Sequence, residues 1–310
     1  MKKAAWIFAA IILAGIAGWW LSSVTQHNVK EAPQITAPSG ADASAIFKQA
    51  SAKLAENKLP EALGIYEKLI NEYPDSKYFA DACIACGDIY VKQGNLTDAK
   101  KFYLRGLKES VTPSMINEAQ KKLWDVNLGI LFSPLPADDS KFYTVNPGDN
   151  LNKIARQFNT TVELIQRSNR LKNDVIFPAQ KLKVCTAKFS IVIDRSQNTL
   201  ALKAGEDILK IYKVATGKNN RTPLGAFTII NKLRDPVWFK VGAVVPSGSP
   251  ENLLGTRWLG ISKPGYGIHG TTNPQSIGNS VTEGCVRMTN RDVEELFVIV
   301  PVGAEVTIVD

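Results

Sequence analysis

The chain has 310 residues, a formal net charge of +8 and a hydrophobic content of 45%. This length is too great for one small core and predicts two or three domains, while the ordinary composition excludes a chain without a folded core. The modest positive charge suits an anionic cell wall or membrane surface, or a scattered solvated face, and we expect no nucleic-acid partner.

Residues 1–24 have the features of a membrane anchor or an export signal. Lys2 and Lys3 precede an uncharged apolar run over 4–21, which is long enough for a marginal membrane span. The lysines favour a cytoplasmic N-terminus. Bulky residues stand at 19–21, where a signal peptidase needs small ones, so we favour an uncleaved membrane helix over a cleaved signal peptide. In either case the rest of the chain is exported.

Residues 25–44 are rich in Pro, Ala, Ser and Thr and predict a flexible linker. The pattern then becomes helical over 45–131, with a last helix predicted at 114–128. The segment resembles a short tetratricopeptide-like module, which binds a protein partner or serves as a plain helical spacer. Small residues let paired helices approach closely in such modules, and small and aromatic residues recur here at the expected spacing, at Gly87, Tyr90, Gly94, Ala99 and Tyr103.

Four cysteines lie at positions 83, 86, 185 and 285. Cys83 and Cys86 form a C-x-x-C pair, which invites a zinc or a redox interpretation. Zinc needs two further ligands, and no partner pair lies nearby in the sequence. A redox pair normally opens a helix after a strand, whereas this pair lies inside a predicted helix. We therefore predict that both thiols pack in the helical module and that Cys185 packs at the end of a strand.

A linker at 132–141 leads to a compact segment at 142–184, in which the pattern predicts a strand, two helices and a second strand. Asp149 or Asn150 is expected to cap the first helix. Thr160 and Glu163 form a predicted capping box for the second helix.

This segment resembles a LysM domain, a βααβ module that binds glycans containing N-acetylglucosamine. The resemblance places the sugar groove between the 147–150 loop and the 175–177 segment. A LysM fold that serves only as a spacer is the alternative. The candidate glycan-binding residues are Gly148, Asp149, Asn150 and Ile176.

Residues 188–310 are dominated by predicted strands. Apolar and polar positions alternate on both sides of a turn at 195–198, and glycine and proline recur as in a β sandwich or barrel. A helix is predicted at 290–299, with Asn290 as its N-cap. The predicted fold class is therefore multidomain α+β, with an N-terminal membrane helix, an α-helical repeat module, a βααβ LysM module and a mostly-β sandwich- or barrel-like domain.

The strongest chemical signal comes from His269 and from Cys285, each of which is flanked by glycine. A thiol becomes an effective nucleophile beside an imidazole, and the other of the two histidines, His27, lies in the predicted linker. His269 is therefore the only credible base. Glycine at 284 lets a carbonyl approach closely and leaves the amides of Gly284 and Cys285 to face an oxyanion. The alternative is a buried cysteine and a core histidine without catalytic roles.

The His269-Gly270-Thr271 and Thr282–Met288 segments, together with 222–227 and 254–260, resemble the L,D-transpeptidase catalytic family of the YkuD type. The resemblance covers about 188–310 and implies a peptidoglycan substrate, attack by Cys285 with His269 as base, and no cofactor or metal. We expect Arg287 to bind a stem carboxylate, because a guanidinium matches a carboxylate through two hydrogen bonds, or else to form a structural ion pair. Many family members carry a second histidine where this chain has Glu283. The candidate oxyanion- and substrate-binding residues are Gly284, Glu283, Arg287, Gly270 and Thr271.

Peptidoglycan is thus the expected partner, and the bacterial cell envelope is the expected location. The N-terminal helix would anchor the protein in the inner membrane, with the C-terminal domains on the periplasmic side. A non-catalytic wall-binding scaffold and a cysteine carboxypeptidase or hydrolase of stem peptides are the alternatives. A papain-like peptidase is disfavoured because it places the cysteine before the histidine and on a helix.

Overall fold

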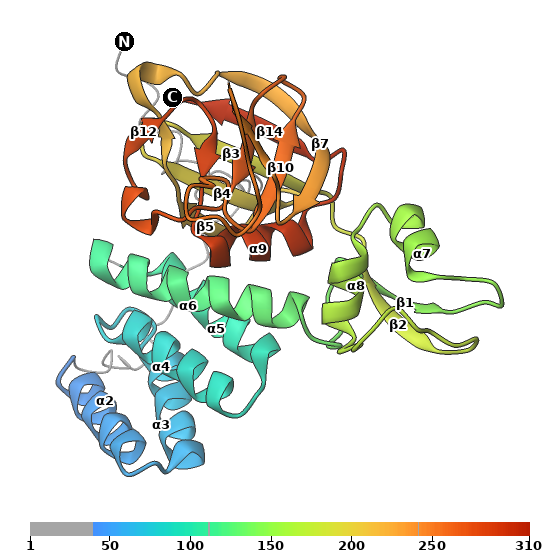
Figure 1. Ribbon diagram of the computed structural model, residues 1–310. Helices are drawn as coiled ribbons and strands as arrows, with labels where there is room; N and C mark the ends of the chain where they lie inside the picture. Colours follow the sequence, from blue (N-terminus) through green and yellow to red (C-terminus); the bar gives the residue numbers. More distant parts are fainter. Residues whose placement is uncertain (1–39, 111, 241) are drawn as a thin grey trace, which may run out of the picture. The chain divides into compact units, whose positions relative to one another are not determined.

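The computed structural model describes residues 40–110, 112–240 and 242–310 (Figure 1). The predicted membrane helix at 1–24 lies outside the described residues, as does most of the predicted linker at 25–44. Within the described ranges, no helix combines the length and the apolar character needed to cross a membrane.

The N-terminal part of the described chain is a row of antiparallel helices. Each helix packs against the next along the chain, as expected of a tetratricopeptide-like array. The helices α4 and α5 approach so closely that a Cβ atom at Gly87 would lie 2.9 Å from Cζ of Tyr103. The helices are α2 (Gly40–Ala55), α3 (Leu59–Glu72), α4 (Phe79–Lys92), α5 (Leu96–Lys108) and α6 (Pro113–Leu131).

The C-x-x-C pair lies inside α4, and the prediction that it packs is confirmed. Cys83 and Cys86 are both buried, and both belong to the core cluster formed by the first helices. Burial raises the pKa of the Cys83 thiol to about 11 and also raises the pKa of Cys86. Neither thiol is therefore a nucleophile at neutral pH. Cys185 is likewise buried, at the end of a strand.

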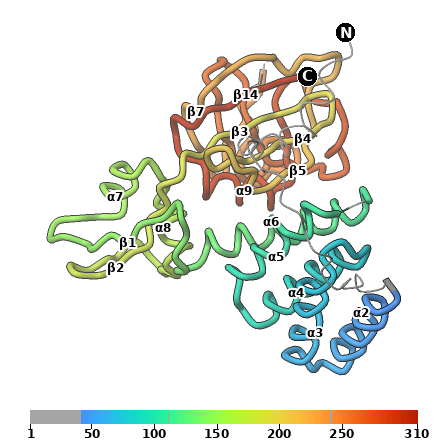
Figure 2. Tube along the Cα trace, turned by 180° about the vertical axis from the view of Figure 1, so that it is seen from behind, coloured from blue at the N-terminus to red at the C-terminus, as the bar shows by residue number. Residues whose placement is uncertain are grey.

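The next segment has the predicted βααβ order, which Figure 2 shows from behind. The two strands pair antiparallel from Ser140↔Cys185 to Thr144↔Lys181. Asn150 caps the first helix by accepting from the Lys153 amide, as predicted. The elements are β1 (Ser140–Thr144), α7 (Leu151–Gln157), α8 (Val162–Ser168) and β2 (Lys181–Cys185).

The predicted capping box of α8 is wrong by one residue. Thr161, which has extended backbone angles, is the N-cap and accepts from the Leu164 amide. The buried hydroxyl of Thr160 has no hydrogen-bond partner among the described residues. The side chain of Glu163 pairs with Arg234 at 2.7 Å, and its local backbone contact is with its own amide rather than with that of Thr160. A tertiary contact thus accompanies a local one that differs from the capping box.

The C-terminal part is built on one curled sheet, which confirms the barrel-like form of the prediction as a half-barrel and corrects the sandwich form (Figure 1). The strand order among the described residues is β13-β11-β10-β7-β14-β3-β4-β5. The predicted hairpin around 195–198 joins β3 and β4. The strands are β3 (Phe189–Asp194), β4 (Thr199–Ala204), β5 (Asp207–Lys213), β7 (Gly225–Arg234), β10 (Arg257–Ile261), β11 (Gly267–His269), β13 (Val286–Arg287) and β14 (Glu305–Val309).

Short elements complete this part of the chain. The helix α9 (Asn290–Ile299) contacts β10 and β11 and has the predicted bounds, but Thr289 rather than Asn290 is its N-cap. Asn290 instead directs its side chain to two backbone amides outside the helix. The short elements are β6 (Thr216–Gly217), η1 (Lys218–Asn220), β8 (Trp238–Lys240), β9 (Ala243–Val245), η2 (Pro274–Ser276) and β12 (Ser280–Thr282).

The βααβ segment shares a core with its neighbours. Leu164 of α8 and Leu131 of α6 belong to the same buried cluster as the sheet and α9. Lys183 of β2 is only 1% exposed, and its Nζ donates to the carbonyls of Ile130 at 2.7 Å and Ser133 at 2.9 Å, at the C-terminal end of α6. A cation is favourable at a helix C-terminus, so the ammonium group joins the helical array to the βααβ segment.

Candidate active site

The register of β11 and β13 brings the chemical motif together. These strands are parallel, with Ile268 opposite Val286 and His269 opposite Arg287. Ile268 and Val286 point into the core and are buried. Because side chains alternate along a strand, His269 and Arg287 leave the sheet on the other face. Cys285 directly precedes β13, and its Sγ lies beside the Gly265 carbonyl and the Gly267 amide, at the start of the strand that carries His269.

Gly284 is required by its backbone conformation. Its φ is +138°, a region that residues with side chains rarely adopt. A Cβ atom would lie 2.7 Å from the Tyr266 ring and 3.1 Å from the carbonyl oxygen of Arg221. The loop before the thiol therefore packs against Tyr266 and against the 221–222 segment with no room for a larger residue.

Two threonines hold the backbone on either side of Cys285. Thr282 Oγ1 donates to the Cys285 carbonyl at 2.6 Å and accepts from the Gly284 amide at 3.2 Å. Thr222, which is buried, donates from Oγ1 to the Gly284 carbonyl at 2.9 Å. The expectation that the Gly284 amide is free to face an oxyanion is therefore wrong, because Thr282 already accepts from it.

His269 is 4% exposed, with its ring stacked at 6.0 Å on that of Trp258. Nδ1 lies 2.7 Å from the Gly270 carbonyl, which can only accept, so Nδ1 carries the proton. Burial lowers the pKa of His269 to about 4, against the opposing effect of the Gly270 carbonyl. The imidazole is therefore neutral at neutral pH, with Nε2 unprotonated, which is the form that a general base needs.

The thiol of Cys285 is partly exposed, and its Sγ lies 3.6 Å from the Gly265 carbonyl. Burial raises the pKa of Cys285, while the Gly267 amide and the Arg287 cation act in the opposite direction. A protonated thiol thus accompanies a neutral imidazole in this state of the protein. Such a pair needs proton transfer during attack and does not start as a thiolate–imidazolium ion pair.

Arg287 offers unused donors on the same face. Nη1 donates to Ser276 Oγ at 3.1 Å, while the buried Nε has no partner among the described residues. Among the described residues no carboxylate forms an ion pair with Arg287, and burial lowers the pKa of the guanidinium. The backbone of Arg287 is fixed by reciprocal hydrogen bonds with Ala215, both at 2.8 Å. The predicted alternative of a structural ion pair therefore has no support among these residues.

The other candidate residues of the site contact different parts of the domain. Glu283 has a side chain that is 70% exposed, and its carboxylate pairs with Lys218 at 2.6 Å and with Arg221, beside η1. Gly270 and Thr271 follow His269, and the Thr271 amide donates to Oδ1 of Asn290 at 2.9 Å. These contacts give Gly270 and Thr271 a clear role in holding the histidine loop against α9.

The predicted glycan residues lie around the first turn of the βααβ segment. The carboxylate of Asp149 accepts from Tyr143 at 2.6 Å and from the Asn146 amide at 2.9 Å, and it pairs with Lys153. These groups hold the pKa of Asp149 well below its usual range. Asn150 caps α7, Gly148 has a φ of +82° in the turn, and Ile176 packs against the core of the segment. The side chains of Asp149 and Asn150 therefore shape the loop.

The sequence did not single out several residues that support the site. Thr282 and Thr222 stand in segments that resemble the family, but nothing in their spacing indicates a contact with the Cys285 loop. Ser276 and Asn290 reach the site only through the fold. Among the described residues, no group of three or more His, Cys, Asp or Glu side chains is placed to hold a metal ion.

Comparison with known proteins identifies three regions. The sequence matches the L,D-transpeptidase catalytic domain of the YkuD family over residues 188–308, the LysM domain over 143–184 and the tetratricopeptide repeat over 44–76. The L,D-transpeptidase YkuD of Bacillus subtilis is 38% identical over 173 residues, which cover 54% of this chain and 97% of that protein. The L,D-transpeptidase YqjB of the same species is 39% identical over 126 residues, which cover 39% of this chain and 70% of that protein.

A solved structure of an L,D-transpeptidase from Mycobacterium tuberculosis aligns with a TM-score of 0.35 and 15% identity, over 44% of this chain and 75% of that one. The family, LysM and tetratricopeptide resemblances are confirmed by the sequence matches. The chain belongs to the L,D-transpeptidases of the YkuD type, a family of cysteine-dependent cell-wall enzymes. It carries a LysM domain, which indicates peptidoglycan binding, and its place is the cell envelope.

Proposed function

We propose that this L,D-transpeptidase forms peptidoglycan crosslinks through a thioester on Cys285. The observation that supports this best is the register of the β11–β13 pair, which sets His269 opposite Arg287, with Sγ of Cys285 beside the Gly265 carbonyl just before β11. A nucleophile, a neutral base and an unpaired cation are the groups that acyl transfer from an anionic peptide needs.

The first half of the reaction releases the terminal residue of a donor stem. The family resemblance implies a tetrapeptide stem with a diamino acid at its third position. Sγ of Cys285 attacks the carbonyl of that residue while His269 takes the thiol proton. The amide of Cys285 stabilises the oxyanion. The C–N bond then breaks, and D-Ala leaves with the proton that His269 returns.

The second half transfers the acyl group from sulfur to an amine. A side-chain amine of a neighbouring stem loses a proton to His269 and attacks the thioester, and Cys285 leaves as the thiol. Water as acceptor would instead give a carboxypeptidase, which is the second candidate function. A neutral imidazole is the required base in either case.

Arg287 is proposed to bind a carboxylate of the stem peptide. A guanidinium matches a carboxylate through two parallel hydrogen bonds, and Nε of Arg287 is a buried donor without a partner among the described residues. Gly284, Glu283, Gly270 and Thr271 complete the proposed site, chiefly through the backbone that they fix.

The other parts of the chain are proposed to bring the site to its substrate. We propose domains at 45–131, 142–184 and 188–310, with linkers at 25–44 and 132–141. The LysM loop at Gly148, Asp149 and Asn150, together with Ile176, would hold the glycan strand. Residues 1–24 would anchor the protein in the inner membrane, and the helical repeats would bind a protein partner.

The test uses purified tetrapeptide muropeptides and mass spectrometry. The wild-type protein should release D-Ala and produce crosslinked dimers, while Cys285→Ala should produce neither. Loss of D-Ala without dimers would favour the carboxypeptidase. An unchanged substrate would favour a wall-binding scaffold. Crosslinking by Cys285→Ala would overturn the assignment of the nucleophile.

A further inference from the structure

We propose that Thr222 is a positioning residue that directs the Cys285 amide toward the oxyanion, and that Arg195 and Asp310 fix the segment that carries Thr222. This inference rests on the proposed role of Cys285 as nucleophile. It concerns the peptide bond between Gly284 and Cys285, whose carbonyl and amide belong to one rigid plane.

The orientation of that peptide is set by Thr222. Its buried hydroxyl, on a residue that is 0% exposed, donates to the Gly284 carbonyl at 2.9 Å. In a trans peptide the carbonyl and the amide point in opposite directions. A carbonyl turned toward Thr222 therefore turns the Cys285 amide away from it. The hydrogen bond fixes the direction of the amide without touching the substrate.

Of the Gly284 and Cys285 amides, the Cys285 amide is the one available to stabilise the oxyanion. The Gly284 amide donates to Thr282 Oγ1 at 3.2 Å, and the Cys285 carbonyl accepts from the same hydroxyl at 2.6 Å. Among the described residues the Cys285 amide has no such internal acceptor. Thr282 thus holds the peptides before and after, and Thr222 holds the peptide between them.

The direction in which the Thr222 hydroxyl donates follows from its two hydrogen-bond partners. Oγ1 accepts from the Gly217 amide at 2.7 Å, so its own proton is directed to the Gly284 carbonyl, which can only accept. The backbone of Thr222 is also confined, because a Cβ atom at Gly217 would lie 2.6 Å from the Thr222 nitrogen. The hydroxyl therefore works as a fixed link between β6 and the loop of the nucleophile.

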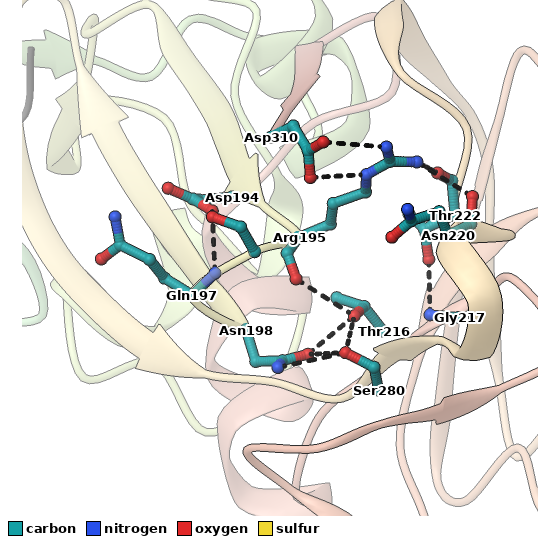
Figure 3. A network of polar contacts seen from close by, with 11 residues as sticks. Asp194, Arg195, Gln197, Asn198, Thr216, Gly217, Asn220, Thr222, Ser280 and Asp310 are labelled. Atoms are coloured by element: carbon teal, nitrogen blue, oxygen red, sulfur yellow. Dashed lines mark hydrogen bonds and ion pairs between the residues drawn. The ribbon is translucent and has the colours of Figure 1, made fainter. Parts of the chain in front are cut away.

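Arg195 secures the segment that carries Thr222 (Figure 3). Its Nη1 donates to the carbonyls of Asn220 at 2.9 Å and Thr222 at 3.0 Å. On the other side, Nε and Nη2 form a bidentate pair with Asp310 at 2.9 Å and 3.0 Å. The φ of Asn220 is +60°, a left-handed conformation that asparagine adopts more readily than most residues, and the hydrogen bond from Arg195 to its carbonyl holds this turn.

Two reactions of the Cys285 sulfur allow the effect of a residue on oxyanion stabilisation to be measured separately from its effect on the position of the thiol. A carbapenem acylates Cys285 by addition to a carbonyl: the S–C bond forms, the lactam C–N bond breaks and the thiol proton passes to the nitrogen. Iodoacetamide alkylates the same sulfur by displacement of iodide, and no oxyanion forms. A residue that only shapes the thiol pocket affects both rates, whereas a residue that aims the oxyanion donor affects acylation alone.

The expected result is selective. In the full-length protein, Thr222→Val keeps the side-chain shape but loses the hydroxyl, and should slow acylation by about 10- to 100-fold, less than the roughly 10²–10³-fold cost of losing an oxyanion donor outright. Alkylation should be unchanged. Thr222→Ser should restore acylation. Thr160→Val is the matched control, because Thr160 is also buried and its hydroxyl has no described partner, and both of its rates should equal those of wild type.

Equal slowing of both reactions in Thr222→Val, or of neither, would overturn the proposal. If Thr222→Val does not fold, as judged by thermal unfolding, Arg195→Gln provides the test from the edge of the network, and an unchanged ratio of the two rates would overturn the proposal there. A wild-type protein that the carbapenem does not acylate at Cys285 would instead refute the proposed nucleophile, which is a separate outcome.

Discussion

The hydroxyl of Thr161, which caps α8 of the LysM domain, also donates to the carbonyl of Val298 in the last turn of α9. One side chain therefore completes the start of one helix and the end of another. The pair Glu163–Arg234 lies beside this contact, and Leu164 enters the core of the catalytic domain. The LysM domain is thus part of the framework that supports the sheet.

Thr161→Val should lower the free energy of unfolding by about 1–2 kcal/mol, because it removes the cap of α8 and the donor to Val298 together. Urea unfolding measures this. The neighbouring Thr160→Val should be neutral or slightly stabilising, because it replaces a buried hydroxyl that has no described partner. Equal effects of the two substitutions would contradict the assigned contacts.

Acylation should retain its rate to unusually low pH. His269 can act as a base only when it is neutral, and its pKa is lowered to about 4, so the rate should fall as the pH drops through about 4 rather than through the ordinary value of 6.5. His269→Gln should slow acylation by about 10²–10⁴-fold at neutral pH. Intact-protein mass spectrometry across pH provides both rates. A wild-type acid limb near the ordinary value would show that the imidazole is not desolvated in solution.

The same histidine should make the fold sensitive to acid. Its pKa is near 6.5 in the unfolded chain and about 4 in the folded one, so the unfolded state takes up a proton first as the pH falls. The contribution of neutral His269 is complete above the unfolded value and is lost toward the folded value, at no more than about 1.4 kcal/mol per pH unit. Urea unfolding at several pH values should show a shallower loss in His269→Gln, and parallel curves would contradict the lowered pKa.

Arg287→Gln should weaken binding of a stem that ends in a free carboxylate. The substitution removes the charge and the Nε donor, which has no described partner. KM should rise for the natural stem and change much less for the same stem with an amidated C-terminus. If both stems are affected equally, Arg287 acts by holding Ser276 and the loop before β12.

The candidate residues of the site could be predicted from the sequence, but their mutual arrangement could not. His269, Cys285 and Arg287 stand in a recognisable pattern, yet the parallel register that sets His269 opposite Arg287 depends on long-range pairing. Lys183 is a second case in which a local sequence pattern does not predict the structure. A lysine in a strand normally predicts an exposed position, and it is buried because the end of α6 supplies carbonyl acceptors. Its acceptors are about fifty residues away, so no local pattern reveals them.

The capping residues show how closely tertiary contacts compete with local ones. Thr160 and Thr161 are adjacent and chemically identical, and Glu163 suits a capping box with the first of them. The choice of Thr161 agrees with two tertiary contacts, the Val298 carbonyl, which accepts from Thr161, and Arg234, which pairs with Glu163. The sequence contains both options, and only the neighbouring domain decides between them.

The position of β14 has a consequence for the order in which the molecule can assemble. This late strand lies between β3, with which it is parallel, and β7, with which it is antiparallel. During synthesis, β3 and β7 therefore emerge with their facing edges unpaired, and they stay exposed to wrong pairing until residues 305–309 follow. The centre of the sheet closes last, so a partly synthesised chain already contains the thiol and the imidazole before the framework that aligns them is complete.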